Sequence, residues 1–321
     1  METYTVASAA AAMRDVGNEI GKAFIGQQDL VDHALITLLA RGHLLVEGVP
    51  GLGKTLLVRA VAQAIGGQSK RAQFTPDLMP SDITGSIILD NGAFTTKKGP
   101  IFTNLFIADE INRAPAKTQA SLFEAMQEFQ VSLDGVSYPL PQPFMVLATQ
   151  NPYEHEGTYP LPDAQKDRFL MKITAGYPDL EEEKRMVSLV LGGSGGGAEL
   201  SVSSVSQVLD PACFAAVRGL AERQRLDPSV IDYAVRLTAA TRSLPGIESG
   251  AGPRGSLALL RCARARALLL GRGFVLPDDV KALAVPVLAH RLTLSAESEL
   301  EELRPGQIIR DLAERLEAPR G

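Results

Sequence analysis

Eight residues, Gly48-Val49-Pro50-Gly51-Leu52-Gly53-Lys54-Thr55, limit what this chain can fold into more than any other stretch. They fill every fixed position of the phosphate-binding pattern G-x-x-x-x-G-K-[ST]. An apolar run at 43–47 predicts a buried strand before them, and residues 55–65 predict a helix after them. A strand, a glycine loop and a helix N-terminus together direct backbone N–H groups at an anion. We therefore predict a nucleotide site in which Lys54 reaches the β- and γ-phosphates and the Thr55 hydroxyl holds Mg²⁺.

Polar residues follow two further apolar runs. The run 105–108 ends in Asp109 and Glu110, and the run 144–148 is followed closely by Asn151. Strands that alternate with helices predict a parallel sheet, whose ligands bind at the carboxyl ends of the strands. The phosphate loop falls at such an end too, so we expect these residues to lie along one edge of the sheet.

Each of these polar residues has two interpretations. Asp109 could hold Mg²⁺ through water while Glu110 polarises the water that attacks the γ-phosphate, or the acidic pair could simply end a strand in solvent. The phosphate loop favours the first interpretation. Asn151 could orient the same water, or it could form an Asx turn before Pro152.

Two arginines are further candidates for phosphate contact. Arg168 precedes a last predicted strand at 169–174, and its planar guanidinium suits a transferring phosphoryl group. The residues alone favour a surface salt bridge between Arg168 and Asp163 or Asp167. Arg254 opens a helix, where acidic residues are usual, and could reach bound phosphates from a helical domain.

Composition describes an ordinary globular protein. The chain has 321 residues, 45% of them hydrophobic and 21% charged, which favours one large and one small domain. Its net charge of −5 gives no electrostatic footprint for nucleic acid. We interpret Arg261, Arg264 and Arg266, which share one predicted helix, as a solvated or interface-facing stripe. Cys213 and Cys262 are far apart and are expected to be reduced.

Targeting signals are not evident in the sequence. The start of the chain lacks the pattern of a signal peptide, and no stretch approaches the roughly 18 apolar residues that span a membrane. We therefore expect a cytoplasmic protein without membrane insertion.

Turn residues predict two hairpins and a change of class later in the chain. Asp90-Asn91-Gly92 and Asp134-Gly135 lie between apolar runs. Gly192 to Gly197, GGSGGG, predicts a flexible linker. The pattern beyond it becomes helical, with helices expected at about 211–225, 228–243, 253–271 and 277–290.

Taken together, these segments resemble the MoxR-type AAA+ ATPases over nearly the whole chain. The resemblance rests on GVPGLGKT (48–55), QFTPDLMPSDITG (73–85), ADEINRAPAKTQ (108–119), EAMQEFQVSLDG (124–135), ATQNPYEHEGTYPLPDAQKDRF (148–169) and GPRGS (252–256). Family members often have Ser where this chain has Gly252, which weakens a possible helix cap before Arg254.

The resemblance implies an α/β fold, an AAA+ αβα core at 1–200 with a parallel sheet, and a small all-helical lid at 201–321. It implies a homo-oligomeric ring, commonly a hexamer, with ATP and Mg²⁺ bound between subunits. Asp109 with Thr55 would hold the metal, and Lys54, Glu110, Asn151 and the arginine finger Arg168 would be catalytic. The implied nucleotide contacts are Ile25, Gly48, Pro50, Gly51, Leu52, Gly53, Lys54, Thr55, Leu56 and Arg254, the last as sensor 2.

The resemblance also implies partners. Inserts at about 76–97 and 131–140 would project towards the pore or the ring face as contacts for a substrate or partner. The family typically works with a von Willebrand factor A domain protein to remodel, activate or insert a cofactor into a client protein. Two alternatives are the ATPase subunit of a magnesium-chelatase-like enzyme and a nucleic-acid motor. The acidic charge and the lack of a helix-turn-helix candidate argue against the motor.

Overall fold

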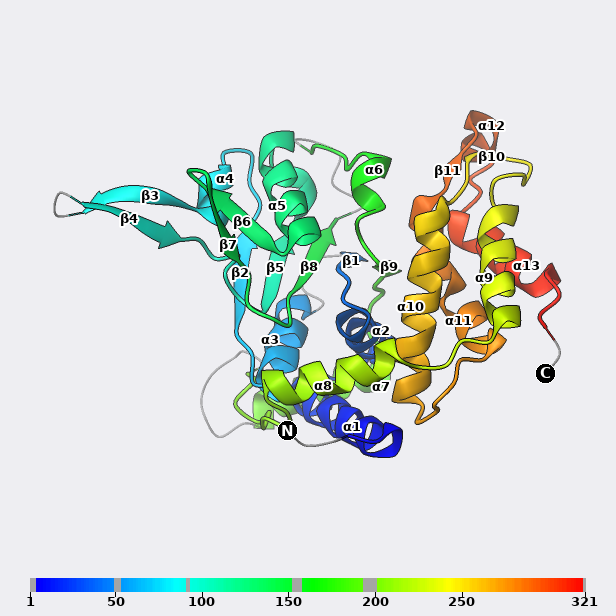
Figure 1. Ribbon diagram of the computed structural model, residues 1–321, viewed down its shortest axis with the longest axis horizontal. Helices are drawn as coiled ribbons and strands as arrows, with labels where there is room; N and C mark the ends of the chain where they lie inside the picture. Colours follow the sequence, from blue (N-terminus) through cyan, green and yellow to red (C-terminus); the bar gives the residue numbers. More distant parts are fainter. Residues whose placement is uncertain (1–3, 49–52, 91–92, 152–157, 193–200, 320–321) are drawn as a thin grey trace.

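Five parallel strands form one sheet, which lies near the middle of Figure 1. The computed structural model describes residues 4–48, 53–90, 93–151, 158–192 and 201–319. Their order across the sheet is β2 (Ser69–Gln73), β5 (Leu105–Asp109), β8 (Met145–Gln150), β1 (Leu44–Glu47) and β9 (Met171–Thr174). In the parallel register Glu47 lies beside Gln150 and Thr174, and Gln73 lies beside Asp109. The carboxyl ends of all five strands therefore meet at one edge, as the sequence predicts.

Helices cover both faces of this sheet (Figure 1). They are α1 (Val6–Ala23), α2 (Gln28–Leu39), α3 (Lys54–Ala64), α5 (Ala116–Glu128) and α7 (Leu180–Gly192), with the short α4 (Pro80–Thr84), η1 (Ile111–Arg113) and α6 (Asp163–Lys166). Gly26 and Gln27 separate α1 from α2, because both adopt a positive φ, 77° and 48°, that an α-helix cannot contain.

Alternate residues of the central strands face two different hydrophobic clusters. In β5, Leu105 and Ile107 join the cluster formed with α1, α2 and α3, whereas Phe106 and Ala108 join the one formed with α5. Burial on both faces explains why the strand sequence is a continuous apolar run and does not alternate with polar residues.

Two antiparallel hairpins leave the core where the turn residues predict them. They are β3 (Gly85–Asp90) with β4 (Ala93–Lys98), and β6 (Gln130–Leu133) with β7 (Val136–Pro139). The β3–β4 hairpin projects far from the body of the molecule (Figure 1). Near its tip Leu89 is 66% and Phe94 is 80% exposed, so the projection presents apolar side chains to solvent.

The lid is helical, as predicted. It contains α8 (Pro211–Glu222), α9 (Pro228–Ala240), α10 (Pro253–Leu269), α11 (Pro277–Leu288), α12 (Ala296–Leu300) and α13 (Pro305–Arg315), with η2 (Ala289–Arg291). A small antiparallel pair, β10 (Ile247–Ser249) with β11 (Thr293–Leu294), was not predicted, because strands this short carry no periodicity. The predicted boundary at residue 200 and the glycine stretch 193–197 lie outside the described residues, so both stay predictions.

Three arginines of α10 contact other elements, one in the core and two within the lid. Arg261 donates to the Ala40 carbonyl after α2, and Arg264 donates to the Gln224 carbonyl after α8. Arg266 forms an ion pair with a buried aspartate of α11. Each guanidinium has a partner in another element while Arg261 stays exposed, so the arginines face neighbouring elements as well as solvent, in line with the expected solvated or interface-facing stripe. Within the described residues, every helix is too short or too polar to span a bilayer.

One buried histidine joins three core elements. His43 precedes β1, and its Nδ1 accepts a hydrogen bond of 3.0 Å from the Val146 N–H in β8. Its Nε2 therefore carries the proton and donates to the Met126 carbonyl in α5, at 2.9 Å. Burial lowers the pKa of His43 to about 4.

We expect acid to weaken the fold through His43. Its pKa is about 4 when folded, below the roughly 6.5 of an unfolded chain, so below pH 6.5 the folded state binds fewer protons. Stability contributed by the neutral ring is thus lost as the pH falls, by about 2 kcal/mol between pH 7 and pH 5. Urea unfolding at both pH values measures this loss, and His43→Gln is the control. Equal pH dependence in the two proteins would contradict the prediction.

Candidate nucleotide site

The start of α3 is built to receive an anion. Gly48 directly follows β1 and donates its N–H to the Gln150 carbonyl at 3.2 Å. Gly53 is the residue before α3 and has a φ of 72°, which favours glycine, and a Cβ there would lie 3.3 Å from the Phe24 ring. The predicted contacts Pro50, Gly51 and Leu52 lie outside the described residues.

Lys54 interacts with both predicted acids at the carboxyl edge, Asp109 and Glu110. Its Nζ donates to the Gly48 carbonyl at 2.9 Å, across the phosphate loop. Burial lowers the pKa of the Lys54 ammonium, and the negative charges of Asp109 and Glu110 act in the opposite direction. The lysine is therefore a half-buried cation whose charged form the two carboxylates favour.

Thr149 holds the two predicted acids in place. Its hydroxyl donates to Asp109 Oδ1 at 2.5 Å and accepts from the Glu110 N–H at 2.8 Å. The strand β8 thus fixes both the carboxylate of Asp109 and the backbone of Glu110, where β5 ends. A single buried hydroxyl sets the geometry of the acidic pair.

Glu110 has an unusual backbone conformation. Its φ is 55°, in the left-handed region that few residues other than glycine adopt. Its Oε2 accepts from Gln73 Nε2 at 2.6 Å and from Arg113 Nη1 at 3.1 Å. Strain of this kind persists where surrounding contacts maintain it, and such strain concentrates at functional sites.

The sequence did not predict the contribution of β2. Arg71 donates from Nε and Nη2 to Asp109 Oδ2 at 3.0 and 2.6 Å, and Gln73 holds Glu110. Residues two apart in a strand share one face, so the spacing of Arg71 and Gln73 was the available signal. The sequence does not show that β2 pairs with β5, so the spacing alone could not predict that these side chains contact Asp109 and Glu110.

The remaining predicted contacts of this edge surround the same place. Asn151 directly follows β8, and Thr55 is the second residue of α3. Leu56 is buried, and its side chain packs in the hydrophobic cluster with α1 and α2. Ile25 lies between α1 and α2, next to the Phe24 ring that packs near Gly53.

Arg168 and Arg254 lie at the opposite edge of the sheet, where the amino ends of the strands meet. We call this the amino edge. The Leu170 N–H donates to the carbonyl of His43, which precedes β1, whereas the phosphate loop follows β1. The two edges are roughly 16 Å apart at the usual rise of a strand, further than an arginine side chain extends. The two arginines come together around Asp167 and not around the Lys54 of their own chain.

These two arginines line one groove of about 280 Å³ with three further arginines, Arg41, Arg261 and Arg291. Arg254 Nη1 pairs with Asp167 at 3.3 Å and its side chain is 60% exposed, and Arg168 donates to the Gln127 side chain. Gly252 precedes α10 without a side-chain cap, as the sequence suggested. The groove is a cationic surface that suits an anion.

The donors at the carboxyl edge suit Mg²⁺ if a nucleotide supplies the rest. Asp109 and Thr55 offer oxygen ligands, which Mg²⁺ prefers. Among the described side chains, no group of three His, Cys, Asp or Glu residues could hold a metal alone. Mg²⁺ commonly binds through one or two carboxylates together with substrate phosphates, so the residues fit.

A phosphate loop on a parallel αβα sheet, an acidic pair on the neighbouring strand and a helical lid define an AAA+ ATPase. The family model for ATPases associated with various cellular activities matches residues 43–171, and the AAA lid domain matches residues 239–312.

Similar proteins narrow this class. The chaperone MoxR1 of Mycobacterium tuberculosis is 41% identical over 312 residues, 94% of this chain and 81% of that protein. The protein YeaC of Bacillus subtilis is 43% identical over 304 residues, 94% of this chain and 92% of that protein. A crystal structure of a candidate ATPase from Cytophaga hutchinsonii is 38% identical, with a TM-score of 0.91 over 98% of this chain and 97% of that one. The chain belongs to the MoxR family of AAA+ ATPases.

We expect Thr149→Val to misplace the acidic pair. The substitution keeps the side-chain shape but removes the hydroxyl that fixes Asp109 and the Glu110 N–H. Loss of such a supporting contact should lower ATP turnover by roughly 10- to 100-fold and raise the Mg²⁺ concentration needed for half-maximal turnover. Phosphate release measured across a Mg²⁺ titration checks this, with Thr149→Ser as the control that restores both. A Val variant with wild-type turnover would contradict the role of Thr149.

Proposed function

We propose that this ATPase works as a homo-oligomeric ring, commonly a hexamer, with ATP and Mg²⁺ bound between subunits. Hydrolysis would drive remodelling, maturation or cofactor insertion of a client protein, together with a von Willebrand factor A domain partner. The observation that supports the ring is the placement of Arg168 and Arg254 on the edge opposite Lys54 and Asp109. The name chaperone, carried by the relative MoxR1, supports a protein client.

Phosphoryl transfer needs positive charge around the γ-phosphate, and the described arginines at this chain's own site already form ion pairs. Arg71 and Arg113 at the carboxyl edge are paired with Asp109 and Glu110. Arg168 and Arg254 cannot reach that edge in their own subunit. A second copy docked head to tail would bring them to the bound nucleotide, and contacts of this kind close into rings when the rotation permits.

The residues at the carboxyl edge then have separate tasks. Lys54 would bind the β- and γ-phosphates, and Glu110 would orient and deprotonate the attacking water, with Asn151 positioning the same water. Asp109 and Thr55 would hold Mg²⁺, which when bound neutralises negative charge on the phosphates. Arg168 and Arg254 of the adjacent subunit would stabilise the charge that develops on the transferring group.

The β3–β4 hairpin is our candidate for contact with the client or the partner. It projects from the core, and Leu89 and Phe94 expose apolar surface near its tip (Figure 1). Leu89 and Phe94 are cross-strand partners and form one apolar patch, and contiguous exposed patches mark interaction sites. The β6–β7 hairpin, where Val136 is exposed, is a second candidate.

Glu110→Gln should retain ATP binding and lose turnover. Glutamine keeps the size of the side chain and can still pair with Gln73, but it cannot accept a proton from water. Removal of a general base lowers turnover on the order of 100-fold or more. Nucleotide binding by fluorescence and phosphate release test the two parts separately. Turnover close to wild type would show that another group activates the water.

Mixing two inactive variants tests the shared site. Arg168→Ala subunits keep an intact phosphate loop, and Lys54→Ala subunits keep an intact Arg168. In rings assembled from equal amounts, about a quarter of the interfaces then combine both wild-type elements. We expect each variant alone to be inactive and the mixture to recover turnover.

The mixing experiment has a clear negative outcome. Failure to recover turnover at any mixing ratio would mean that Arg168 does not act on a neighbouring subunit. Turnover per subunit that stays constant with protein concentration, on a particle of monomer size, would contradict the ring in the same way.

A further inference from the structure

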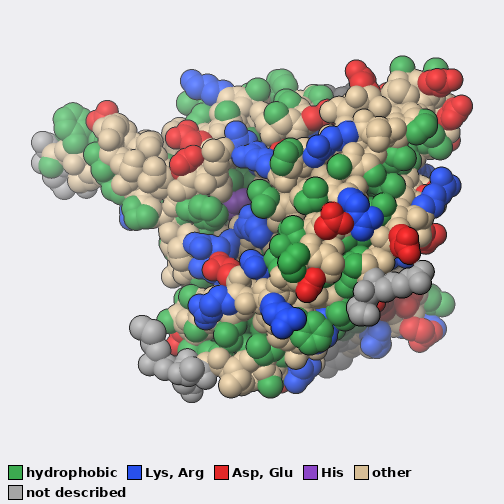
Figure 2. All heavy atoms as spheres, turned by 45° about the vertical axis from the view of Figure 1, so that its right-hand side comes forward, with side chains coloured by type: hydrophobic (Ala, Val, Ile, Leu, Met, Phe, Trp, Pro, Cys, Tyr) green, Lys and Arg blue, Asp and Glu red, His purple; other side chains and the backbone are tan. Residues whose placement is uncertain are grey.

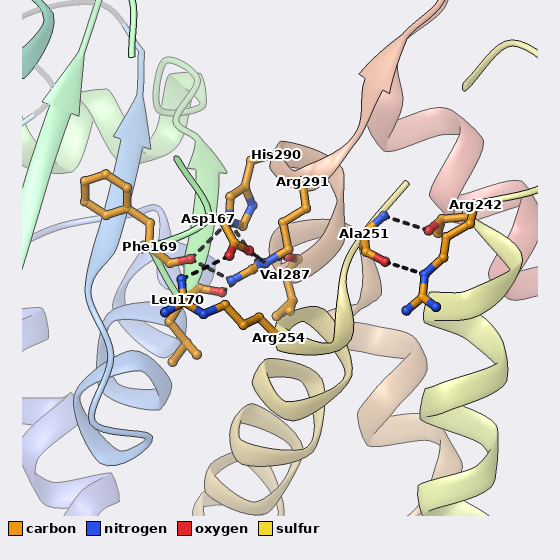
Figure 3. Close-up of polar contacts among 10 residues, drawn as sticks. Asp167, Phe169, Leu170, Arg242, Ala251, Arg254, Val287, His290 and Arg291 are labelled. Atoms are coloured by element: carbon orange, nitrogen blue, oxygen red, sulfur yellow. Dashed lines mark hydrogen bonds and ion pairs between the residues drawn. The ribbon is translucent and has the colours of Figure 1, made fainter. Parts of the chain in front are cut away.

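Arg291 of the lid is inserted between the lid and the core (Figure 3). Its side chain is 4% exposed. Its Nε donates to Asp167 Oδ1 at 2.9 Å, and its Nη2 donates to the Phe169 carbonyl at 2.8 Å. The Nη1 group donates to the carbonyls of Leu170, at 3.4 Å, and of Val287. One guanidinium therefore binds the core segment 167–170 at three residues.

The segment that Arg291 holds is the one that carries Arg168. Asp167 precedes this arginine and Phe169 follows it, so the contacts of Arg291 fix the backbone on both sides of Arg168. The other oxygen of Asp167, Oδ2, accepts from Arg254 (Figure 3). Through Asp167, a single lid residue thus positions both arginines of the amino edge.

Further lid contacts reinforce the same segment. The Nε2 atom of His290 lies 3.1 Å from the Phe169 carbonyl, and burial together with the Arg291 charge lowers the pKa of this histidine. The Thr293 hydroxyl donates to Asp163 at 2.9 Å. The residues around η2 therefore form one continuous attachment between the lid and the stretch 163–170.

A guanidinium is the side chain that this place requires. Burial of a cation is costly unless it is paired and its donors are satisfied. Asp167 supplies the charge, and backbone carbonyls accept the remaining donors of the planar fork. A lysine has one nitrogen and could not reach Asp167, Phe169 and Leu170 together.

We propose that Arg291 is a positioning residue that couples the lid to the two arginines, so that the lid of one subunit controls hydrolysis at the site which that subunit completes on its neighbour. The inference rests on the proposed ring. A shift of η2 relative to the core would move Asp167 and the backbone of Arg168, while Lys54 and Asp109 of the same subunit lie at the far edge of the sheet.

The test uses Arg291→Gln in full-length protein. A misplacement of about 1 Å in a catalytic group can cost about 100-fold, and we expect that loss of turnover for the variant alone, with unchanged ATP affinity. Mixed with Lys54→Ala subunits, it should recover turnover to the level of the Arg168→Ala mixture. Mixed with Arg168→Ala subunits, it should not recover, because both variants damage the same element.

Arg264→Gln is the matched control. Arg264 is also a lid arginine that donates to a backbone carbonyl, but its partner Gln224 follows α8 and does not belong to the segment 167–170. Its substitution should leave turnover within about twofold of wild type. Asp167→Asn, which changes the core side of the contact, should behave as Arg291→Gln does and provides a second variant if that one fails to assemble.

The outcomes separate this inference from the proposed ring. If Lys54→Ala subunits restore turnover when mixed with Arg168→Ala subunits, but not when mixed with Arg291→Gln or Asp167→Asn subunits, the role of Arg291 is overturned and the ring stands. Recovery with neither would overturn the ring and the inference together. A lower ATP affinity of Arg291→Gln at protein concentrations too low for subunits to assemble would show that Arg291 serves the site of its own subunit, which also contradicts the proposal.

Discussion

The parallel pairing of β1 with β8 and β9 decides where each charged group of this ATPase lies. All five strands point the same way, so the residues that follow them gather at one edge and the residues that precede them gather at the other. Lys54, Asp109 and Glu110 belong to the first edge, and Arg168 belongs to the second. The sheet is buried on both faces, where unpaired polar groups would cost free energy, so the charged side chains lie at the two ends of its strands. The groups to which we assign catalytic roles are thereby divided between opposite ends of the strands of one sheet.

Each edge is maintained by contacts between elements that are distant in the chain. Thr149 fixes the acidic pair from β8, while Arg71 and Gln73 hold the same pair from β2. Arg291 holds the segment around Arg168 from the lid. In each case a buried or half-buried donor satisfies a carboxylate or a carbonyl, and loss of one partner would leave the other without compensation. The geometry of the site is therefore a property of the whole fold.

The sequence predicted those parts of the molecule whose signals are local. The phosphate loop, the apolar strands, the hairpin turns and the four long lid helices are each encoded within a few neighbouring residues. Contacts between distant residues were not accessible in this way. Arg71 and Asp109 are 38 positions apart, and Asp167 and Arg291 are 124 positions apart, with no periodicity to relate them. The roles of the expected site residues stay predictions, and only the structure shows that Arg168 and Arg254 lie together, away from Lys54.

The hydrophobic cluster around α1, α2 and α3 also contains residues of α8, α9, α10 and α11, so the lid and the core share one apolar interior. A lid that swung away as on a hinge would expose this interior, at about 25 cal/mol for each Å² of apolar surface. Sliding of packed helices past one another keeps it covered. We therefore expect any movement of this lid during hydrolysis to be a small shear of α10 along α2. Such a displacement would be transmitted directly to the core segment that the lid contacts.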